Sequence, residues 1–92
     1  MNDEQIRLLE RAGEVGLHKC QIEVLTRTDI PTSLLMIIFE YFIKANNEMN
    51  FKESTEHADF CIDVLLHKRD IGEIKTVKMA KLVLKEMLSW KE

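Results

Sequence analysis

The stretch from Thr32 to Ala45, TSLLMIIFEYFIKA, constrains the fold more than any other part of the chain. Residues 34–39 are apolar without a break, and residues 41–43 follow after a single glutamate. At 3.6 residues per turn these side chains point to nearly every side of a helix, so neighbouring helices or lipid must cover them. The run is shorter than the roughly 20 apolar residues that cross a bilayer. We therefore expect it to be the buried central helix of a small bundle.

The length and composition favour one soluble helical domain over residues 1–92. The chain has 92 residues, of which 46% are hydrophobic and 32% charged, values typical of a single globular domain. The net charge of −3 argues against non-specific nucleic-acid or membrane binding as the role of the whole domain. The first residues are charged, so we expect no signal peptide and a cytoplasmic location. Cys20 and Cys61 form no CxxC pattern, which favours two reduced thiols over a disulfide.

The first two helices can be placed from turn signals. The first predicted helix begins at Asn2 or Asp3, either of which can cap a first turn, and extends to about Val24. Gly13, Gly16 and Cys20 lie in its apolar stripe. Two interpretations of the glycines stay open: another helix approaches closely there, or the helix is broken near Gly13. The second predicted helix covers residues 31–45, since a proline is well suited to a first turn.

Two further helices complete the prediction. The third begins at Asn50, with Glu53 at the spacing of a capping box. The fourth begins after residues 67–69, where Asp70 and Glu73 have the same spacing. Short connections between helices usually mean antiparallel neighbours. The sequence therefore predicts an all-α fold, a small antiparallel four-helix bundle that can also be described as two packed helical hairpins.

An apolar row on the third predicted helix is the first candidate binding site. The row lies beside the stripe expected to face the core, and consists of His57, Phe60, Val64 and His67. Aromatic residues are enriched in the centres of protein interfaces. Met79 and Trp90 form a second apolar shoulder on the fourth helix. Two interpretations stay open: these residues pack against the rest of the bundle, or they bind a partner protein or a second copy of the chain, as in a homodimer.

No catalytic or metal site is predicted. His57 and Cys61 are one helical turn apart, but a zinc site needs about four ligands. Cys61 lies on the stripe of the third predicted helix that is expected to face the core, and a buried thiol in apolar surroundings is inert. Asp59 and Asp63 are interpreted as solvated acids on an exposed face. A chain of this size also has little scope for the deep pocket that enzymes use, so we expect neither an enzyme nor a cofactor.

A lysine row is the second candidate binding site. Residues 68–85 contain six basic and two acidic residues, a local charge of +4. The row lies opposite the apolar stripe of the fourth predicted helix and consists of Lys75, Lys78, Lys81 and Lys85. It can be a solvated face, a site for an acidic protein, or a site for nucleic-acid phosphates. The helix has no Arg, Asn or Gln to read base edges, which makes nucleic acid the less favoured partner.

The sequence predicts a small non-enzymatic cytoplasmic protein that works by protein–protein interaction, as a chaperone, an adaptor or an inhibitor of the immunity type. The alternative is a nucleic-acid-binding regulator that uses the lysine row. In architecture alone, such a chain is similar to bacteriocin immunity proteins, secretion chaperones and phage or bacterial anti-factors, which occupy the surface of a partner. If Tyr41 or Phe42 is exposed, the binding surface lies instead on the central helix.

Overall fold

The central helix is α3, Thr32–Ala45, which ends where the sequence predicts and begins one residue later, with Pro31 as its N-terminal cap. In this computed structural model, which describes residues 1–89, Leu35, Ile38 and Phe42 are completely buried. The helix contacts each of the other four helices of the described chain, as its apolar surface requires. Tyr41 is buried as well, so the alternative that placed a binding surface at Tyr41 or Phe42 is wrong.

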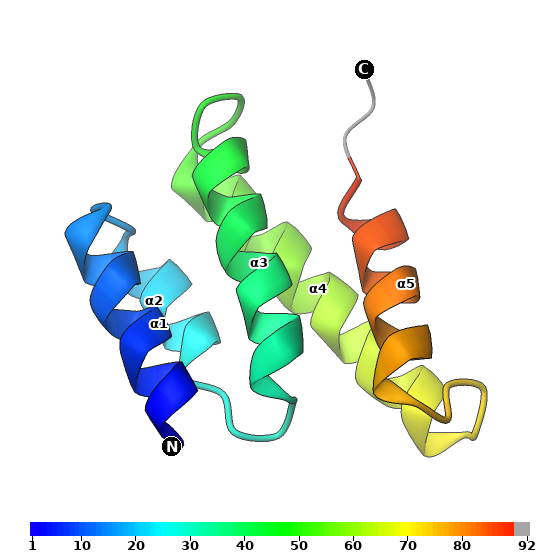
Figure 1. Ribbon diagram of the computed structural model, residues 1–92. Helices are drawn as coiled ribbons and strands as arrows, with labels where there is room; N and C mark the ends of the chain where they lie inside the picture. Colours follow the sequence, from blue (N-terminus) through cyan, green and yellow to red (C-terminus); the bar gives the residue numbers. More distant parts are fainter. Residues whose placement is uncertain (90–92) are drawn as a thin grey trace.

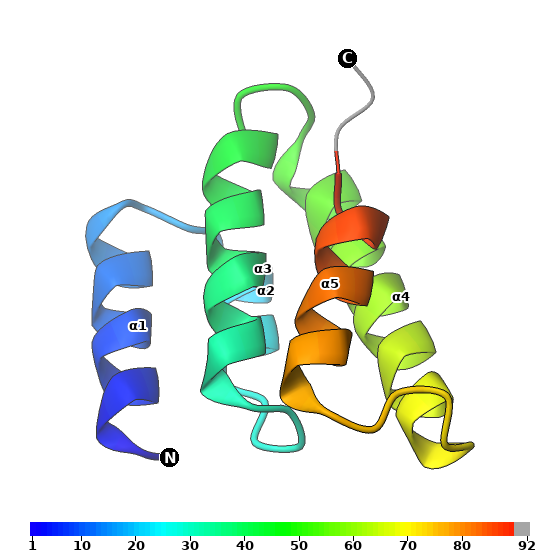
Figure 2. The same cartoon turned by 45° about the vertical axis from the view of Figure 1, so that its right-hand side comes forward.

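The remaining helices lie around α3 in two layers. Their bounds are Asp3–Glu14 for α1, Lys19–Leu25 for α2, Phe51–Asp70 for α4 and Val77–Met87 for α5. Figure 1 shows α1, α3 and α5 side by side in the front layer, with α2 and α4 behind them. The turned view agrees (Figure 2), and successive helices run in opposite directions in both views. Two helical layers explain why the molecule measures 36 × 34 Å in two directions and only 17 Å in the third.

The first predicted helix is two helices, which corrects the predicted number from four to five within residues 1–89. The break lies at Gly16, whose φ of +78° is a backbone conformation that favours glycine. The amide of Leu17 donates to the carbonyl of Ala12 at 3.0 Å, and the amide of Gly16 donates to that of Gly13 at 3.2 Å. These two bonds form a Schellman motif, which ends α1. No atom lies within 4 Å of a Cβ built on Gly13, so the interpretation of close helix approach is wrong.

The break also changes which side of α2 faces the core. A continuous helix would have placed Cys20 on the buried stripe, yet Cys20 is exposed and its neighbour Gln21 is completely buried. The side chain of Gln21 joins the N-terminus of α2 to α3 and α4. Its Nε2 donates to Asn46 Oδ1 and to Ser54 Oγ, both at 2.9 Å. Its Oε1 accepts from the amide of His18 at 3.1 Å and from Asn46 Nδ2 at 3.2 Å.

The connection between α4 and α5 differs from the prediction in the same way. Asp70 and Glu73 do not cap a helix, because α4 continues to Asp70 and ends in a second Schellman motif. Gly72 has a φ of +84°, and the amide of Glu73 donates to the carbonyl of Lys68 at 2.9 Å. Helix α5 begins seven residues later than predicted, at Val77, where Thr76 accepts a capping bond from the amide of Met79 at 3.1 Å.

No helix within residues 1–89 is both long enough and apolar enough to cross a membrane.

Candidate interaction surface

The outward side of α4 carries the candidate row. Helix α4 faces the core with Cys61, Ile62 and Leu65, all buried. The residues a third of a turn away face solvent instead. Phe60 is 65% exposed, and it is followed along the same side by Val64, which is half-buried, and by the exposed His67. The interpretation that Phe60 packs into the bundle is therefore wrong.

Phe60, Val64 and His67 line a shallow, open hollow together with a residue that the sequence did not indicate, Ile71. Ile71 lies one turn beyond His67 at the C-terminal cap of α4 and is 56% exposed. The other residues lining the hollow are charged, and consist of Asp63, Lys68 and Glu73. Lys68 Nζ and Glu73 Oε2 form an ion pair at 3.1 Å. We call these seven residues the α4 hollow.

His57 does not join the α4 hollow. Its ring lies against Tyr41, with centroids 5.6 Å apart, and its Nε2 lies 3.9 Å from the Sγ of Cys61. The Cys61 thiol donates to the carbonyl of Met87 at 4.0 Å, and burial raises its pKa. A thiol whose pKa lies above its ordinary value stays protonated at neutral pH and is a poor nucleophile. His57 and Cys61 therefore lie close together, but the raised pKa of Cys61 does not favour the thiolate that a reactive site needs.

The second apolar shoulder is separate from the hollow. Met79 is partly exposed on α5 and does not line the α4 hollow. Trp90 lies outside the described residues. Within the described residues, Met79 and the row on α4 therefore do not line one common hollow. The hollow instead extends along α4 into the loop that follows it.

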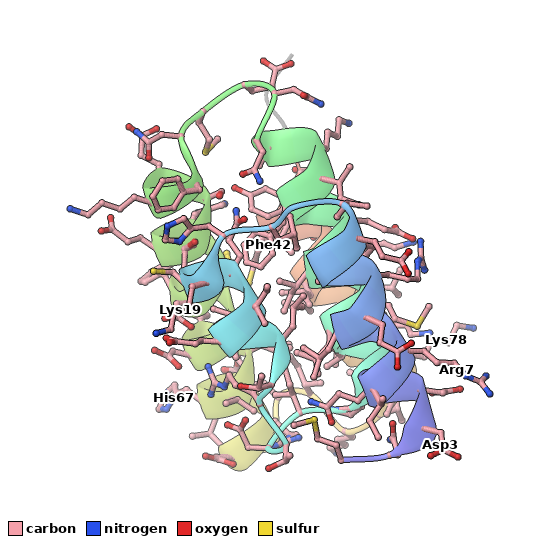
Figure 3. The ribbon with its side chains drawn as sticks, turned by 90° about the vertical axis from the view of Figure 1, so that its left-hand side faces the viewer. Asp3, Arg7, Lys19, Phe42, His67 and Lys78 are labelled. Carbon is pink, nitrogen blue, oxygen red and sulfur yellow. The ribbon has the colours of Figure 1, made fainter. Side chains whose placement is uncertain are left out.

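The lysine row is exposed along its whole length. Lys78, Lys81 and Lys85 lie on α5, whereas Lys75 lies in the preceding loop because the helix begins later than predicted. Leu82 interrupts the row and is 62% exposed. Figure 3 shows Lys78 and His67 pointing away from one another on opposite sides of the molecule. The lysine row and the α4 hollow can therefore contact two different partners.

An arginine that the sequence did not single out organises the acids of α4. The guanidinium of Arg27 donates two hydrogen bonds to the Asp29 carboxylate, at 2.7 and 3.0 Å. Its Nη1 lies 3.7 Å from Asp59 and 3.6 Å from Asp63. The hydrogen bond to Arg27 lowers the pKa of Asp29, and the same bond raises the pKa of Arg27. These ion pairs link the α2–α3 connection to α4. The side chains of Asp59 and Asp63 stay 54% and 72% exposed, as the sequence predicted for solvated acids, and ion pairs this exposed contribute little to stability.

Neither a metal centre nor a likeness to a known protein helps to assign the site. Within residues 1–89, no group of three or more His, Cys, Asp or Glu side chains is arranged to hold a metal ion. No protein-family model, curated protein or solved structure matches the chain.

Proposed function

We propose that the protein acts without catalysis, by binding another protein through the α4 hollow. The observation that carries this proposal is the 65% exposure of Phe60 at one end of an apolar row that continues through Val64 to Ile71. A large aromatic side chain left in water forgoes the stabilisation of burial, about 25 cal/mol for each Å² of apolar surface. Aromatic residues also dominate the binding energy of many interfaces.

The composition of the α4 hollow supports the same function. Phe60, Val64 and Ile71 supply apolar side chains, while Asp63, Lys68 and Glu73 supply charged ones. Protein interfaces usually combine apolar side chains with charged ones that stay accessible to solvent. Binding of this kind suits a chaperone, an adaptor or an inhibitor. The free thiols of Cys20 and Cys61 support a reducing compartment such as the cytoplasm.

The variant Phe60→Asp tests the proposal, with Leu82→Asp as its matched control. Both residues are exposed to a similar degree, 65% and 62%, but they lie on different helices. Proteins retained from a native lysate by the immobilised wild type are quantified against those retained by each variant. We expect Phe60→Asp to lose the specific partner at least tenfold while Leu82→Asp retains it. Equal retention by Phe60→Asp would contradict the proposal.

A folding check separates a binding defect from an unfolded variant. Because Phe60 is largely exposed, Phe60→Asp should leave the helical circular dichroism and the unfolding midpoint almost unchanged. If Phe60→Asp unfolds, the row belongs to the core and the proposal is wrong. Size-exclusion chromatography with light scattering identifies the case of a homodimer: the wild type would then be dimeric and Phe60→Asp monomeric.

Nucleic-acid binding through the lysine row is the second candidate. The exposed ammonium groups of Lys75, Lys78, Lys81 and Lys85 favour it. Phosphate contacts release counterions, so any such binding must weaken steeply as salt is raised. This candidate is excluded if the protein does not bind duplex DNA at low salt, or if its affinity for the DNA does not change between 50 and 200 mM salt.

A further inference from the structure

A small pocket lies at the end of the molecule where α3 begins, α4 ends and α5 begins, the lower end of Figure 2. Its volume is about 120 Å³. The side chains that form its floor come from all three helices and the α4–α5 loop, and are almost completely buried: Leu34, Leu65, Ile74 and Ala80. The partly exposed Val77 lines its mouth. The pocket shares no residue with the α4 hollow.

Two basic side chains line the pocket, and no acidic side chain lines it. Arg69 and Lys75 are both exposed and both belong to its lining. Arg69 Nη2 donates to the carbonyl oxygen of Asp29 at 3.3 Å, which holds the guanidinium beside the pocket. The Asp29 carboxylate, whose first partner is Arg27, also feels the charge of Arg69, but Asp29 does not line the pocket. Lys75 takes part in none of the ion pairs formed within residues 1–89.

The first turn of α5 adds positive potential at the same place. Thr76 and Val77, the N-terminal cap and first residue of the helix, line the pocket. The amides of a helix N-terminus carry a partial positive charge and attract anions. Residues 68–85 have a local charge of +4 although the whole chain carries −3. The pocket is therefore apolar inside and positive at its mouth.

The volume of the pocket favours a single apolar side chain over a larger small molecule. Pockets for small molecules usually have volumes of about 300–1,000 Å³, whereas a dry cavity of about 150 Å³ holds one benzene ring. A volume of about 120 Å³ therefore suits one aliphatic side chain of four or five carbon atoms. Single apolar side chains in such pockets are typical anchors of protein interfaces.

We propose that this pocket binds an acidic segment of a partner protein, with one leucine-sized side chain inside it. Carboxylates on either side of that anchor pair with Arg69 and Lys75 at the mouth. The proposal concerns a surface other than the α4 hollow, and it stands or falls independently of the function proposed for the hollow.

Nuclear magnetic resonance titration of the ¹⁵N-labelled full chain tests the proposal. The probes are three capped heptapeptides with a central leucine flanked by Asp and Glu, a central alanine with the same flanks, and a central leucine flanked by Lys. We expect the acidic leucine peptide to shift the amides of Ile74, Val77 and Ala80. The alanine peptide should bind at least tenfold more weakly, since three buried carbon atoms are lost. The lysine-flanked peptide should cause no shift.

Two charge reversals then distinguish the pocket from general electrostatic attraction. Lys75→Glu should weaken the acidic leucine peptide at least fivefold. Lys52→Glu changes the net charge equally, at an exposed position in the first turn of α4, and should leave the affinity within twofold. Phe60→Asp should also leave it unchanged.

Three results would overturn the proposal. One is equal affinity for the leucine and alanine peptides. Another is equal weakening by Lys75→Glu and Lys52→Glu. The third is the absence of shifts at residues 74–80 with several millimolar peptide, whether the shifts move to the α4 hollow or vanish. None of these results contradicts the function proposed for the α4 hollow, so failure here leaves that function in place.

Discussion

The replacement Gln21→Leu tests whether a buried polar side chain holds the two layers together. Gln21 is completely buried and makes four hydrogen bonds with three partners, His18, Asn46 and Ser54. Leucine has a similar volume but can form none of these bonds. The variant therefore removes the polar connection between α2, α3 and α4 while it keeps the space filled.

The expected loss is about 2–3 kcal/mol. Each hydrogen bond contributes about 0.5–1.5 kcal/mol net, so four of them contribute about 4 kcal/mol. Two effects reduce this sum: leucine gains about 1 kcal/mol or more from burial, and the exposed Asn46 can bond to water instead. At about 0.05–0.15 kcal/mol per residue, a chain of this length has a total stability of roughly 5–14 kcal/mol. We therefore expect Gln21→Leu to fold, with a clearly lower stability.

Urea unfolding followed by circular dichroism measures the difference. With a slope of about 1 kcal/mol per M urea, typical of small domains, the midpoint should fall by about 2–3 M. Glu23→Leu, at an exposed position on the same short helix, is the control and should change the midpoint by less than about 0.5 M. A midpoint for Gln21→Leu that equals or exceeds that of the wild type would refute the reasoning.

Three further predictions follow from single contacts. Gly13→Ala should stabilise the protein by up to about 1 kcal/mol, because Gly13 is helical with open space around it. Gly16→Ala should instead destabilise it by about 1 kcal/mol or more, because the φ of Gly16 is positive. Urea unfolding in which both variants change the unfolding free energy with the same sign would contradict this. The pKa of Asp29 is lowered from its ordinary 3.8, so this group contributes stability above about pH 4, and that contribution is lost as the pH falls through its folded pKa. The difference in Tm between wild type and Asp29→Asn should therefore be steady from pH 5 to 8 and shrink below pH 4. A difference that grows on acidification would exclude the ion pair. A thiol reagent should modify the exposed Cys20 within minutes in the native protein and the buried Cys61 only on unfolding, as mass spectrometry of the labelled peptides can show.

The sequence predicted best where a long apolar or amphipathic run decides the structure. The central helix could be placed because its apolar residues leave no polar side for solvent. Phe60 and Val64 could be identified because they are apolar residues on the otherwise polar face of a long amphipathic helix. The exposure of Phe60 itself needed the structure, since an apolar residue beside a core stripe can pack in either direction.

The sequence prediction failed where a single backbone conformation decides the structure. Gly16 and Gly72 both end helices at positive φ, and nothing in the residue type distinguishes this use from a glycine inside a helix. Joining α1 to α2 continued the helical period through the break, which assigned Cys20 to the core and hid Gln21. Starting the last helix at Asp70 separated Ile71 from α4 and removed one residue from the α4 hollow.

Hydroxyl-radical footprinting of the complex with its partner tests the central claim most directly. The oxidation rates of Phe60 and Leu82 are compared in the free protein and in the complex, because both side chains are largely exposed in the free chain. The α4 hollow as the binding surface predicts that oxidation of Phe60 falls several-fold in the complex while that of Leu82 stays constant. Protection of Leu82 with no change at Phe60 would contradict the account and assign binding to α5.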